Sequence, residues 1–391
     1  MEDTVFKERY KKLNKSQKKA VDTIDGPVLV VAGPGSGKTE ILSLRVANIL
    51  RETDIAPSNI LCMTFTDSAS NNMRERLAEI IGREAYRVAI HTFHSFGVEV
   101  IDKNPEFFYS GANFIPADDL AQLEIVETIL TDLDHNNPLR SIHPEQGFVY
   151  AGSLVQAIGN LKKAGLTPEE FKAILDHNKE EIEFANPLLA EVFDERLSKS
   201  SFEKIVRLIQ KLQTYKSKPF PVSHLTPWLP NVAYSLKRAL EEAERQEKAT
   251  ALSRWKTKNT KKDDDGKRVH RDHINLEKMY ALAFVYEKYK AEMYARGYYD
   301  FDDMLLEAIQ AIQKNNRLRY DLQEQFQYVL VDEFQDTNDA QVRLLRLITD
   351  AEVHEGRPNV MAVGDDDQAV YKFQGAEISN ILDFKGAYRD P

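Results

Sequence analysis

The feature that most constrains the fold is a glycine-rich loop, AGPGSGKT at residues 32–39, between an apolar run and a helical pattern. The apolar run, PVLVV at residues 27–31, has the length and composition of a buried strand. After the loop, Leu42, Val46 and Ile49 recur at helical spacing. A strand that turns through glycines directly into a helix is typical of α/β folds, so the sequence predicts a parallel sheet covered by helices.

Four more short apolar runs have the character of buried strands, and a helical pattern follows most of them. They lie at residues 60–65, 87–91, 328–331 and 359–363. Between about residues 101 and 299 this alternation stops, and apolar residues recur at helical spacing instead. The sequence therefore predicts an α/β domain of residues 1–100 and 300–391, with an all-α domain of residues 101–299 inserted into it.

Two segments inside the predicted insertion are informative. The run Thr167-Pro168-Glu169-Glu170 is a capping box with proline at the first helical position, so it predicts the start of a helix. Residues 256–273, KTKNTKKDDDGKRVHRDH, are nearly free of apolar side chains. Their composition predicts a solvated, disordered loop, and a basic arm that touches nucleic acid is the alternative.

Composition limits the class of protein. The 391 residues carry 62 acidic and 52 basic side chains, for a net charge of −10, which argues against a surface made mainly for nucleic acid. A narrow basic or aromatic groove remains compatible with that balance. The single cysteine, Cys62, rules out a disulfide framework within the chain, and the N-terminus has no apolar signal region. We expect a soluble protein in the reducing cytoplasm, with no membrane partner.

The glycine-rich loop has the chemistry of a phosphate site. Successive backbone N–H groups of such a loop point at phosphate oxygens, and the following helix adds the positive end of its dipole. Lys38 would reach the β- and γ-phosphates, and the Thr39 hydroxyl would bind Mg²⁺. The alternative is a flexible turn that contains GKT by chance. The predicted nucleoside triphosphate site comprises Gly33, Gly35, Ser36, Gly37, Lys38 and Thr39.

A pair of carboxylates follows a later strand, in YVLVDEFQDT at residues 328–337. The strand would deliver Asp332 and Glu333 to the carboxyl edge of the sheet, where α/β folds place their ligands. Asp332 would hold Mg²⁺, and Glu333 would orient and deprotonate an attacking water. The alternative is a helix cap. Together with the phosphate loop, the pair predicts hydrolysis of the nucleotide.

With these residues in place, the chain resembles the first half of a superfamily 1 DNA helicase of the UvrD/Rep/PcrA type. The resemblance rests on motifs in the expected order: LNKSQKKAV (13–21), AGPGSGKT (32–39), MTFTDSA (63–69), HTFHSF (91–96), YDFDDML (299–305), DEFQD (332–336) and GDDDQAVYKFQGA (364–376). It implies a RecA-like P-loop NTPase sheet and ATP with Mg²⁺ as ligands. It also places Gln17 where the family recognises the adenine base.

The same resemblance implies a contact surface for single-stranded DNA. Gln368 would sense the γ-phosphate, and Tyr371 and Phe373, a few residues later, would contact bases. Phe65 would complete the base pocket, with His94 nearby. Because every base has a π-face, aromatic side chains can hold a strand without reading its sequence. The alternative is that Tyr371 and Phe373 are core residues beside an acidic turn.

Three positions depart from the family pattern. Glu40 and Gln374 stand where many relatives have arginine, and Ser68 stands where many have lysine. These changes remove positive charge near the nucleotide and DNA. The inserted region is also longer than in the simplest members.

The roles of two lysines and two aspartates stay open. Lys162 and Lys163 would touch the DNA backbone, as on a similar helix of relatives, or lie on a solvated face. Asp300 and Asp303 are three residues apart, and we expect them mainly to cap the helix that follows.

The resemblance further implies that this chain lacks the family's second motor domain. We therefore expect a fragment that binds ATP, hydrolyses it feebly and does not unwind DNA alone. Arginines supplied by the missing domain would account for the difference, since such contacts are worth ~10³–10⁵ in turnover.

The function that the resemblance implies is an ATP-dependent helicase or translocase on single-stranded DNA and its junctions with duplex. It would move 3′ to 5′ in DNA repair or recombination. The alternatives are the motor portion of a helicase–nuclease subunit and a non-motor ATP-dependent switch. RNA is a less favoured substrate.

Overall fold

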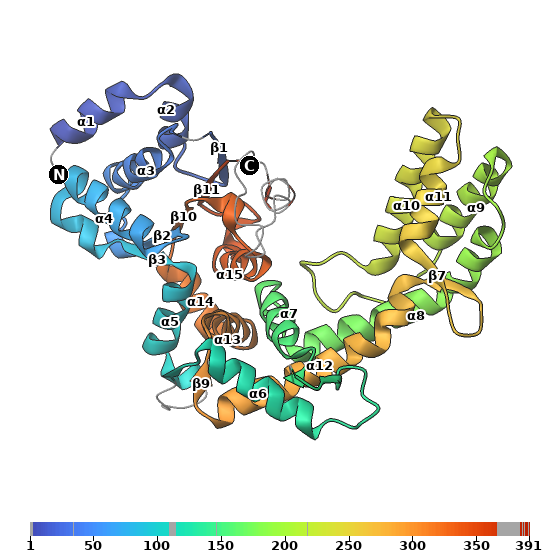
Figure 1. The fold of residues 1–391 in the computed structure, drawn as a ribbon. Helices are drawn as coiled ribbons and strands as arrows, with labels where there is room; N and C mark the ends of the chain where they lie inside the picture. Colours follow the sequence, from blue (N-terminus) through green and yellow to red (C-terminus); the bar gives the residue numbers. More distant parts are fainter. Residues whose placement is uncertain are drawn as a thin grey trace. The chain divides into compact units, whose positions relative to one another are not determined.

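The computed structural model describes residues 3–33, 35–108, 115–145, 147–216 and 218–365, together with 384, 386, 388, 389 and 391 (Figure 1). The chain divides into two compact units. Unit 1 comprises residues 1–118, 159–166 and 297–391, and unit 2 comprises residues 119–158 and 167–296.

A five-stranded parallel sheet forms the centre of unit 1, in the order β1-β11-β10-β2-β3. The strands are β1 (Val28–Val31), β2 (Ile60–Thr64), β3 (Ala89–Thr92), β10 (Tyr328–Val331) and β11 (Val360–Gly364). All five correspond to the apolar runs in the sequence, so the prediction of an α/β domain with a parallel sheet is confirmed.

Helices cover both faces of this sheet because its central strands are apolar on both sides. On β2, Ile60 and Cys62 pack on one face and Leu61 and Met63 on the other. The first face is covered by α1 (Asp3–Lys12), α2 (Lys15–Asp22), α3 (Lys38–Glu52) and α4 (Asp67–Ile81). The second is covered by α5 (Phe93–Lys103), α13 (Phe301–Lys314), α14 (Asn316–Gln325) and α15 (Asp339–Thr349).

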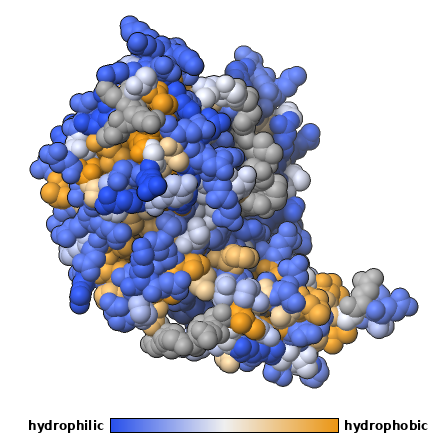
Figure 2. Space-filling view, turned by 90° about the vertical axis from the view of Figure 1, so that its left-hand side faces the viewer, coloured by the Kyte–Doolittle hydropathy of each residue, from blue (hydrophilic) through white to orange (hydrophobic). Residues whose placement is uncertain are grey.

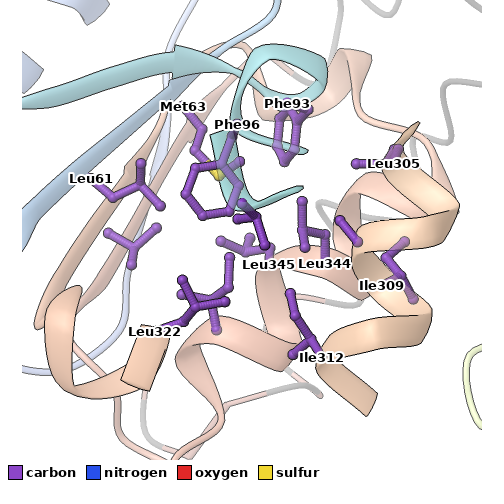
Figure 3. Close-up of a cluster of buried hydrophobic side chains, with 14 of the residues drawn as sticks. Leu61, Met63, Phe93, Phe96, Leu305, Ile309, Ile312, Leu322, Leu344 and Leu345 are labelled. Carbon is purple, nitrogen blue, oxygen red and sulfur yellow. The ribbon is translucent and has the colours of Figure 1, made fainter. Parts of the chain in front are cut away.

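Figure 3 shows the core on the second face, where Phe93 and Phe96 of α5 lie among side chains of β2, α13 and α15. Leu61, Met63, Phe96 and Ile309 are each at most 1% exposed. Burying a side chain of this size contributes about 1.5–3 kcal/mol. This layer therefore fixes β2 and β3 against helices that lie more than 200 residues later in the sequence.

The chain leaves unit 1 and returns to it through a pair of short strands. β4 (Ile115–Pro116) and β9 (Tyr298–Tyr299) pair in parallel, with Ile115 N–H donating to the Gly297 carbonyl. This pairing ties the two ends of the intervening segment together within unit 1.

Unit 2 is mainly helical. Its helices are α6 (Asp119–Asp132), most of α7 (Ala151–Lys163), α8 (Pro168–Phe193), α9 (Phe202–Gln213), α10 (Trp228–Arg245), α11 (Thr250–Asn259) and α12 (Arg271–Ala295). One core joins α8, α9, α10 and α11, and includes Phe193, Leu236 and Trp255. Two antiparallel hairpins accompany the helices, β5 (Ile142–His143) with β6 (Gly147–Phe148) and β7 (Thr260–Lys262) with β8 (Arg268–His270).

The second hairpin corrects the prediction of a disordered loop at residues 256–273. This segment forms the end of α11, the β7–β8 hairpin and the start of α12. Val269 and His270 are buried, and the His270 N–H donates to the Asn186 side chain at 2.9 Å. The few buried groups that order this hairpin are too sparse to produce an apolar pattern in the sequence.

Both predicted helix caps are present. Thr167 and Glu170 exchange hydrogen bonds at the start of α8, and Asp300 and Asp303 do the same at the start of α13. Each reciprocal pair satisfies N–H groups that have no partner within the helix.

Lys162 does not lie on a surface. It is 1% exposed, and its Nζ lies 2.6 Å from both Asp300 Oδ2 and Asp303 Oδ1. Burial opposes the charge on this lysine, but the two aspartates outweigh it and raise the pKa of Lys162 above its usual value. Both readings of Lys162, a DNA contact and a solvated face, are therefore wrong, because the ammonium belongs to a buried ion triad within unit 1.

No helix of the described ranges has the length and apolar character needed to cross a bilayer. On the face of the molecule in Figure 2, hydrophilic residues predominate and apolar residues form separate patches.

Replacing Lys162 by methionine should destabilise the protein strongly. The substitution keeps the side chain's length but leaves Asp300 and Asp303 buried without their cation, and such a loss typically costs ~3–5 kcal/mol. Lys163→Met, at the half-buried neighbouring position, should change stability by less than about 0.5 kcal/mol. Chemical denaturation of both variants measures the difference, and equal stabilities would contradict the structural role of the triad.

Candidate functional site

Most of the predicted site residues that the structure describes gather at one edge of the sheet of unit 1. Because all five strands are parallel, the segments that follow them emerge at the same carboxyl edge. The glycine-rich loop follows β1, Asp365 follows β11, and Asp332 follows β10. Phe65 follows β2, and His94 lies just past β3, at the first turn of α5. The residues predicted to bind the nucleotide thus lie at one end of this edge, and Phe65 and His94 lie at the other.

The backbone of the glycine-rich loop has the shape of a phosphate cradle. Gly35 and Gly37 have φ of 70° and 81°, in the left-handed region that favours glycine. Gly37 is the N-cap of α3, and no side chain caps that helix. The Ser36 Oγ is buried and has no hydrogen-bond partner among the described residues. Unsatisfied donors at a helix start, beside a buried hydroxyl, fit the oxygens of a phosphate.

Lys38 lies among carboxylates at this edge. Its Nζ is 3.3 Å from Glu333 Oε2 and 3.9 Å from Asp365 Oδ2, and the residue is 8% exposed. Asp365 is 1% exposed, and the sequence analysis did not single it out. Only the packing of β11 beside β1 and β10 places Asp365 next to Lys38.

Asp332 and Thr39 form an oxygen pair that fits Mg²⁺. The Thr39 Oγ1 donates to Asp332 Oδ2 at 3.3 Å, and Asp332 is 4% exposed. Burial, with a smaller contribution from the charge of Glu333, raises the pKa of Asp332 to about 6. A carboxylate that is costly to ionise beside a hydroxyl suits a hard cation, which supplies the missing positive charge.

Glu333 is held in an unusual geometry. Its φ of 49° and ψ of 47° lie in the left-handed region, which is uncommon for a residue other than glycine. Its N–H donates to Asp332 Oδ1 at 3.0 Å. Backbone strain of this kind persists where the surroundings enforce it, and it fixes the direction in which the Glu333 carboxylate points.

Gln335 holds the Glu333 carboxylate from the other side. The Gln335 Nε2 donates to Glu333 Oε2 at 2.7 Å, and the Gln335 Oε1 accepts the Asp365 N–H at 2.9 Å. Gln335 is 2% exposed, so its bond to the Asp365 N–H is buried, whereas its bond to Glu333 is partly accessible to water. One side chain thus joins the segment after β10 to the segment after β11. Gln335 lies inside the DEFQD motif, but no spacing in the sequence marks it as a functional residue.

Gln17, predicted to recognise the base, is bonded to the glycine-rich loop. Its Nε2 donates to the Ser36 carbonyl at 2.9 Å, and its Oε1 accepts the Asn14 N–H at 2.8 Å in the capping box of α2. Helix α2 and the loop are therefore directly connected.

Glu40, where relatives often have arginine, has cations around it. Arg9 and Arg76 lie 3.3 and 3.5 Å from Glu40 Oε2. The negative charge of Glu40 beside the loop is therefore balanced by Arg9 and Arg76.

At the other end of the edge, Phe65 is half-buried and His94 lies against α13. The His94 Nε2 is 3.6 Å from Asp302 Oδ1, and its ring meets the edge of Phe301 at a centroid distance of 6.2 Å. Phe301 is 67% exposed, an aromatic surface that the sequence analysis did not mark, although it lies in YDFDDML. Gln368, Tyr371, Phe373 and Gln374 lie outside the described residues.

Residues 13–389 match the family of the UvrD/REP helicase N-terminal domain. The chain belongs to this family. It is 26% identical over 378 residues to the ATP-dependent DNA helicase PcrA of Staphylococcus epidermidis, and 25% identical over 376 residues to PcrA of Staphylococcus aureus. These alignments cover 97% and 96% of this chain but 36% of each relative. The chain thus spans about a third of the length of these curated relatives.

The UvrD/REP match extends over both units. Its range includes the sheet of unit 1 and the helices of unit 2.

Asp332→Asn should stabilise the protein at neutral pH, in the absence of divalent cations. The pKa of this carboxyl is about 6 in the folded chain against an ordinary 3.8, so the folded state resists its ionisation. The penalty, up to roughly 3 kcal/mol, is fully present above pH 6 and disappears as the pH falls toward 4.

Thermal denaturation in EDTA from pH 4.5 to pH 8 measures this effect. The stability gain of Asp332→Asn over the wild type should grow with pH, whereas Asp264→Asn, at an exposed carboxylate, should show no such trend. A gain that is independent of pH would argue against an Asp332 that is costly to ionise.

Proposed function

We propose that this chain is the ATP-binding N-terminal portion of an ATP-dependent DNA helicase that translocates on single-stranded DNA. The observation that carries the proposal is the convergence of the glycine-rich loop, Lys38, Asp332 and Glu333 at the carboxyl edge of one parallel sheet. Both PcrA relatives are named ATP-dependent DNA helicases. The same proposal includes translocation in the 3′ to 5′ direction and a preference for junctions with duplex DNA. It also includes a role in DNA repair or recombination and a cytoplasmic location.

In this proposal residues 1–100 and 300–391 form a RecA-like ATPase domain, and residues 101–299 are a domain inserted into it. The parallel sheet supports the first part, and the pairing of β4 with β9 supports the second, since it joins the two ends of the segment. Residues 159–166 extend the ATPase part, because Lys162 pairs there with Asp300 and Asp303.

The nucleotide would lie over the glycine-rich loop. Its phosphates would be held by the start of α3, by the Ser36 hydroxyl and by the backbone N–H groups of Gly33, Gly35 and Gly37. Gln17 would lie beside the base. Lys38 would exchange its ion pairs with Glu333 and Asp365 for contacts to the β- and γ-phosphates.

Hydrolysis would follow from the same residues. Glu333 would accept a proton from the water that attacks the γ-phosphorus, and ADP would leave with the bridging oxygen. Thr39 and Asp332 would hold Mg²⁺, which neutralises charge on the β- and γ-phosphates when it is bound. Once Lys38 no longer pairs with Glu333, Gln335 would still orient the Glu333 carboxylate. That carboxylate could then act as a base.

Single-stranded DNA would cross the opposite end of the edge. Phe65 and His94 lie at the ends of neighbouring strands, and the exposed ring of Phe301 extends the aromatic surface beside His94. We assign Tyr371 and Phe373 to base contacts and Gln368 to the γ-phosphate on the family resemblance. An acidic chain can bind a strand in this way because base stacking, at about 1–3 kcal/mol per base, needs no excess of positive charge.

The test is to measure the affinity of the protein for fluorescent oligothymidine by anisotropy, with and without Mg²⁺ and a non-hydrolysable ATP analogue. The nucleotide should change the dissociation constant roughly fivefold or more, since two coupled sites typically interact by 1–3 kcal/mol. Lys38→Ala should bind DNA but lose this response. Lys314→Ala, an exposed lysine at the end of α13, is the matched control and should respond as the wild type does.

Two results would contradict the proposal. Nucleotide binding without DNA binding at low salt would favour a non-motor switch. An unchanged response in Lys38→Ala would mean that the nucleotide acts at another site.

Gln335→Met should slow hydrolysis without weakening nucleotide binding. Methionine has a similar volume but cannot orient the Glu333 carboxylate, so kcat for DNA-stimulated ATP hydrolysis by the full-length protein should fall roughly 10- to 100-fold, with KM nearly constant. In a Glu333→Gln background the same substitution should cost little more, because Gln335 would then have no base to position. Equal effects in both backgrounds, or a rise in KM alone, would show that Gln335 does not act through Glu333.

A further inference from the structure

Unit 2 contains a hollow that the proposed function does not use. It lies between α10 and α11 and has a volume of about 660 Å³. The two helices lie side by side in Figure 1 and share a core through Leu236, Ala251 and Trp255. The Trp255 Nε1 donates to the Ser235 Oγ at 3.0 Å, which links the two walls. The hollow therefore lies between two helices that pack against each other.

Positive charges line both walls of this hollow. Arg238 and Arg245 are seven residues apart on α10, two turns or about 10 Å along one face. Lys258 lies on α11, on the opposite wall. All three are exposed, and within the described part of the chain their side chains have neither an ion pair nor a hydrogen bond.

Two glutamates also line the hollow, but each already has a cation. Glu241 lies 3.9 Å from Lys237, and Glu242 lies 3.9 Å from Arg254. The lining itself has four basic residues, Arg238, Arg245, Arg254 and Lys258, and these two acidic ones, so its formal charge is +2. In a chain of net charge −10, three unpaired cations around one hollow indicate an anionic ligand.

The basic character continues from α11 into the hairpin. Residues 250–262, TALSRWKTKNTKK, contain five basic residues and no acidic one. Lys261 and Lys262 on β7 are exposed. These two lysines continue the basic sequence beyond α11 without lining the hollow, and three aspartates, Asp263 to Asp265, follow them in the turn of the hairpin.

An exposed aromatic ring completes the surface. Tyr234 is 63% exposed, one turn before Arg238 on the same face of α10. Nucleic acid strands are held by cations that contact their phosphates and by aromatic rings that stack on their bases. The hollow has both.

We propose that the hollow between α10 and α11 binds the phosphate backbone of DNA, with Tyr234 stacking on an unpaired base. This inference rests on the proposed function, and it adds a second DNA contact on unit 2 to the one at the sheet edge. A polynucleotide fits better than an isolated phosphate because the cations that line the hollow are spread along α10 and α11.

The test compares two double variants that each remove two positive charges from unit 2 of the full-length protein. Arg238→Gln with Lys258→Gln removes charge from the hollow. Lys172→Gln with Lys216→Gln, two exposed lysines that do not line it, is the matched control. Affinity for oligothymidine and for a blunt duplex is measured by anisotropy between 50 and 200 mM salt, and thermal denaturation checks folding.

The hollow variant should bind DNA roughly tenfold more weakly at low salt, and the control should bind as the wild type does. The slope of log affinity against log salt should become shallower by about 1.4 on oligothymidine and about 1.8 on duplex, the values for two lost phosphate contacts. Tyr234→Ala should weaken oligothymidine roughly fivefold or more and leave duplex unchanged, whereas Tyr234→Phe should retain affinity.

The outcomes separate this inference from the proposed function. Equal effects of the two doubles, or no effect of either, would overturn the site on unit 2 and leave nucleotide-dependent DNA binding intact. A wild-type protein that binds no DNA at low salt would overturn both. A loss on duplex alone, with Tyr234→Ala silent, would support the phosphate site and overturn the stacking contact.

Discussion

The candidate site depends on the parallel pairing of β11 between β1 and β10. Val31 pairs with Gly364, and Val331 pairs with Ala362, so the three strands end nearly level. This register brings the glycine-rich loop, Asp332 and Asp365 together, although they are separated by up to about 330 residues in sequence. A shift of one residue in either pairing would turn the alternating side chains to the opposite faces of the sheet. The two apolar layers on either side of the sheet therefore also fix the geometry of the site.

Charge balance explains what this geometry requires of a ligand. Lys38 is the cation placed among three carboxylates, Asp332, Glu333 and Asp365. A triphosphate would add further negative charge, so the lysine alone cannot compensate for it. The start of α3 and the loop N–H groups supply positive charge at the same edge. A divalent cation held by Thr39 and Asp332 would add more. Burial first, and the charge of Glu333 second, raise the pKa of Asp332, so a cation beside this carboxylate would favour its ionised form.

The sequence predicts those features that depend on local pattern. The five strands, the glycine-rich loop and the caps at Thr167 and Asp300 follow from apolar runs and short spacings, and the structure confirms them. Lys162, Gln335 and residues 260–270 are different. Lys162 reads as a surface lysine because its partners come 138 and 141 residues later. Gln335 and Asp365 meet only once β10 and β11 pair, and the hairpin is ordered by the contact of His270 with Asn186. Tertiary contacts decide these positions, and no spacing along the chain encodes them.

Under the proposed function, the Gln335 link bears on how nucleotide hydrolysis would change DNA binding. Its amide binds Glu333 on one side and the backbone N–H of Asp365 on the other, immediately before the segment that carries Gln368, Tyr371 and Phe373. A ligand shifts a conformational equilibrium only as far as its affinity differs between the two states. A nucleotide that withdraws Lys38 from Glu333 and Asp365 would alter both ends of the Gln335 link at once. The energy of that exchange would then reach the segment that we propose to contact DNA, through one buried side chain and one backbone hydrogen bond.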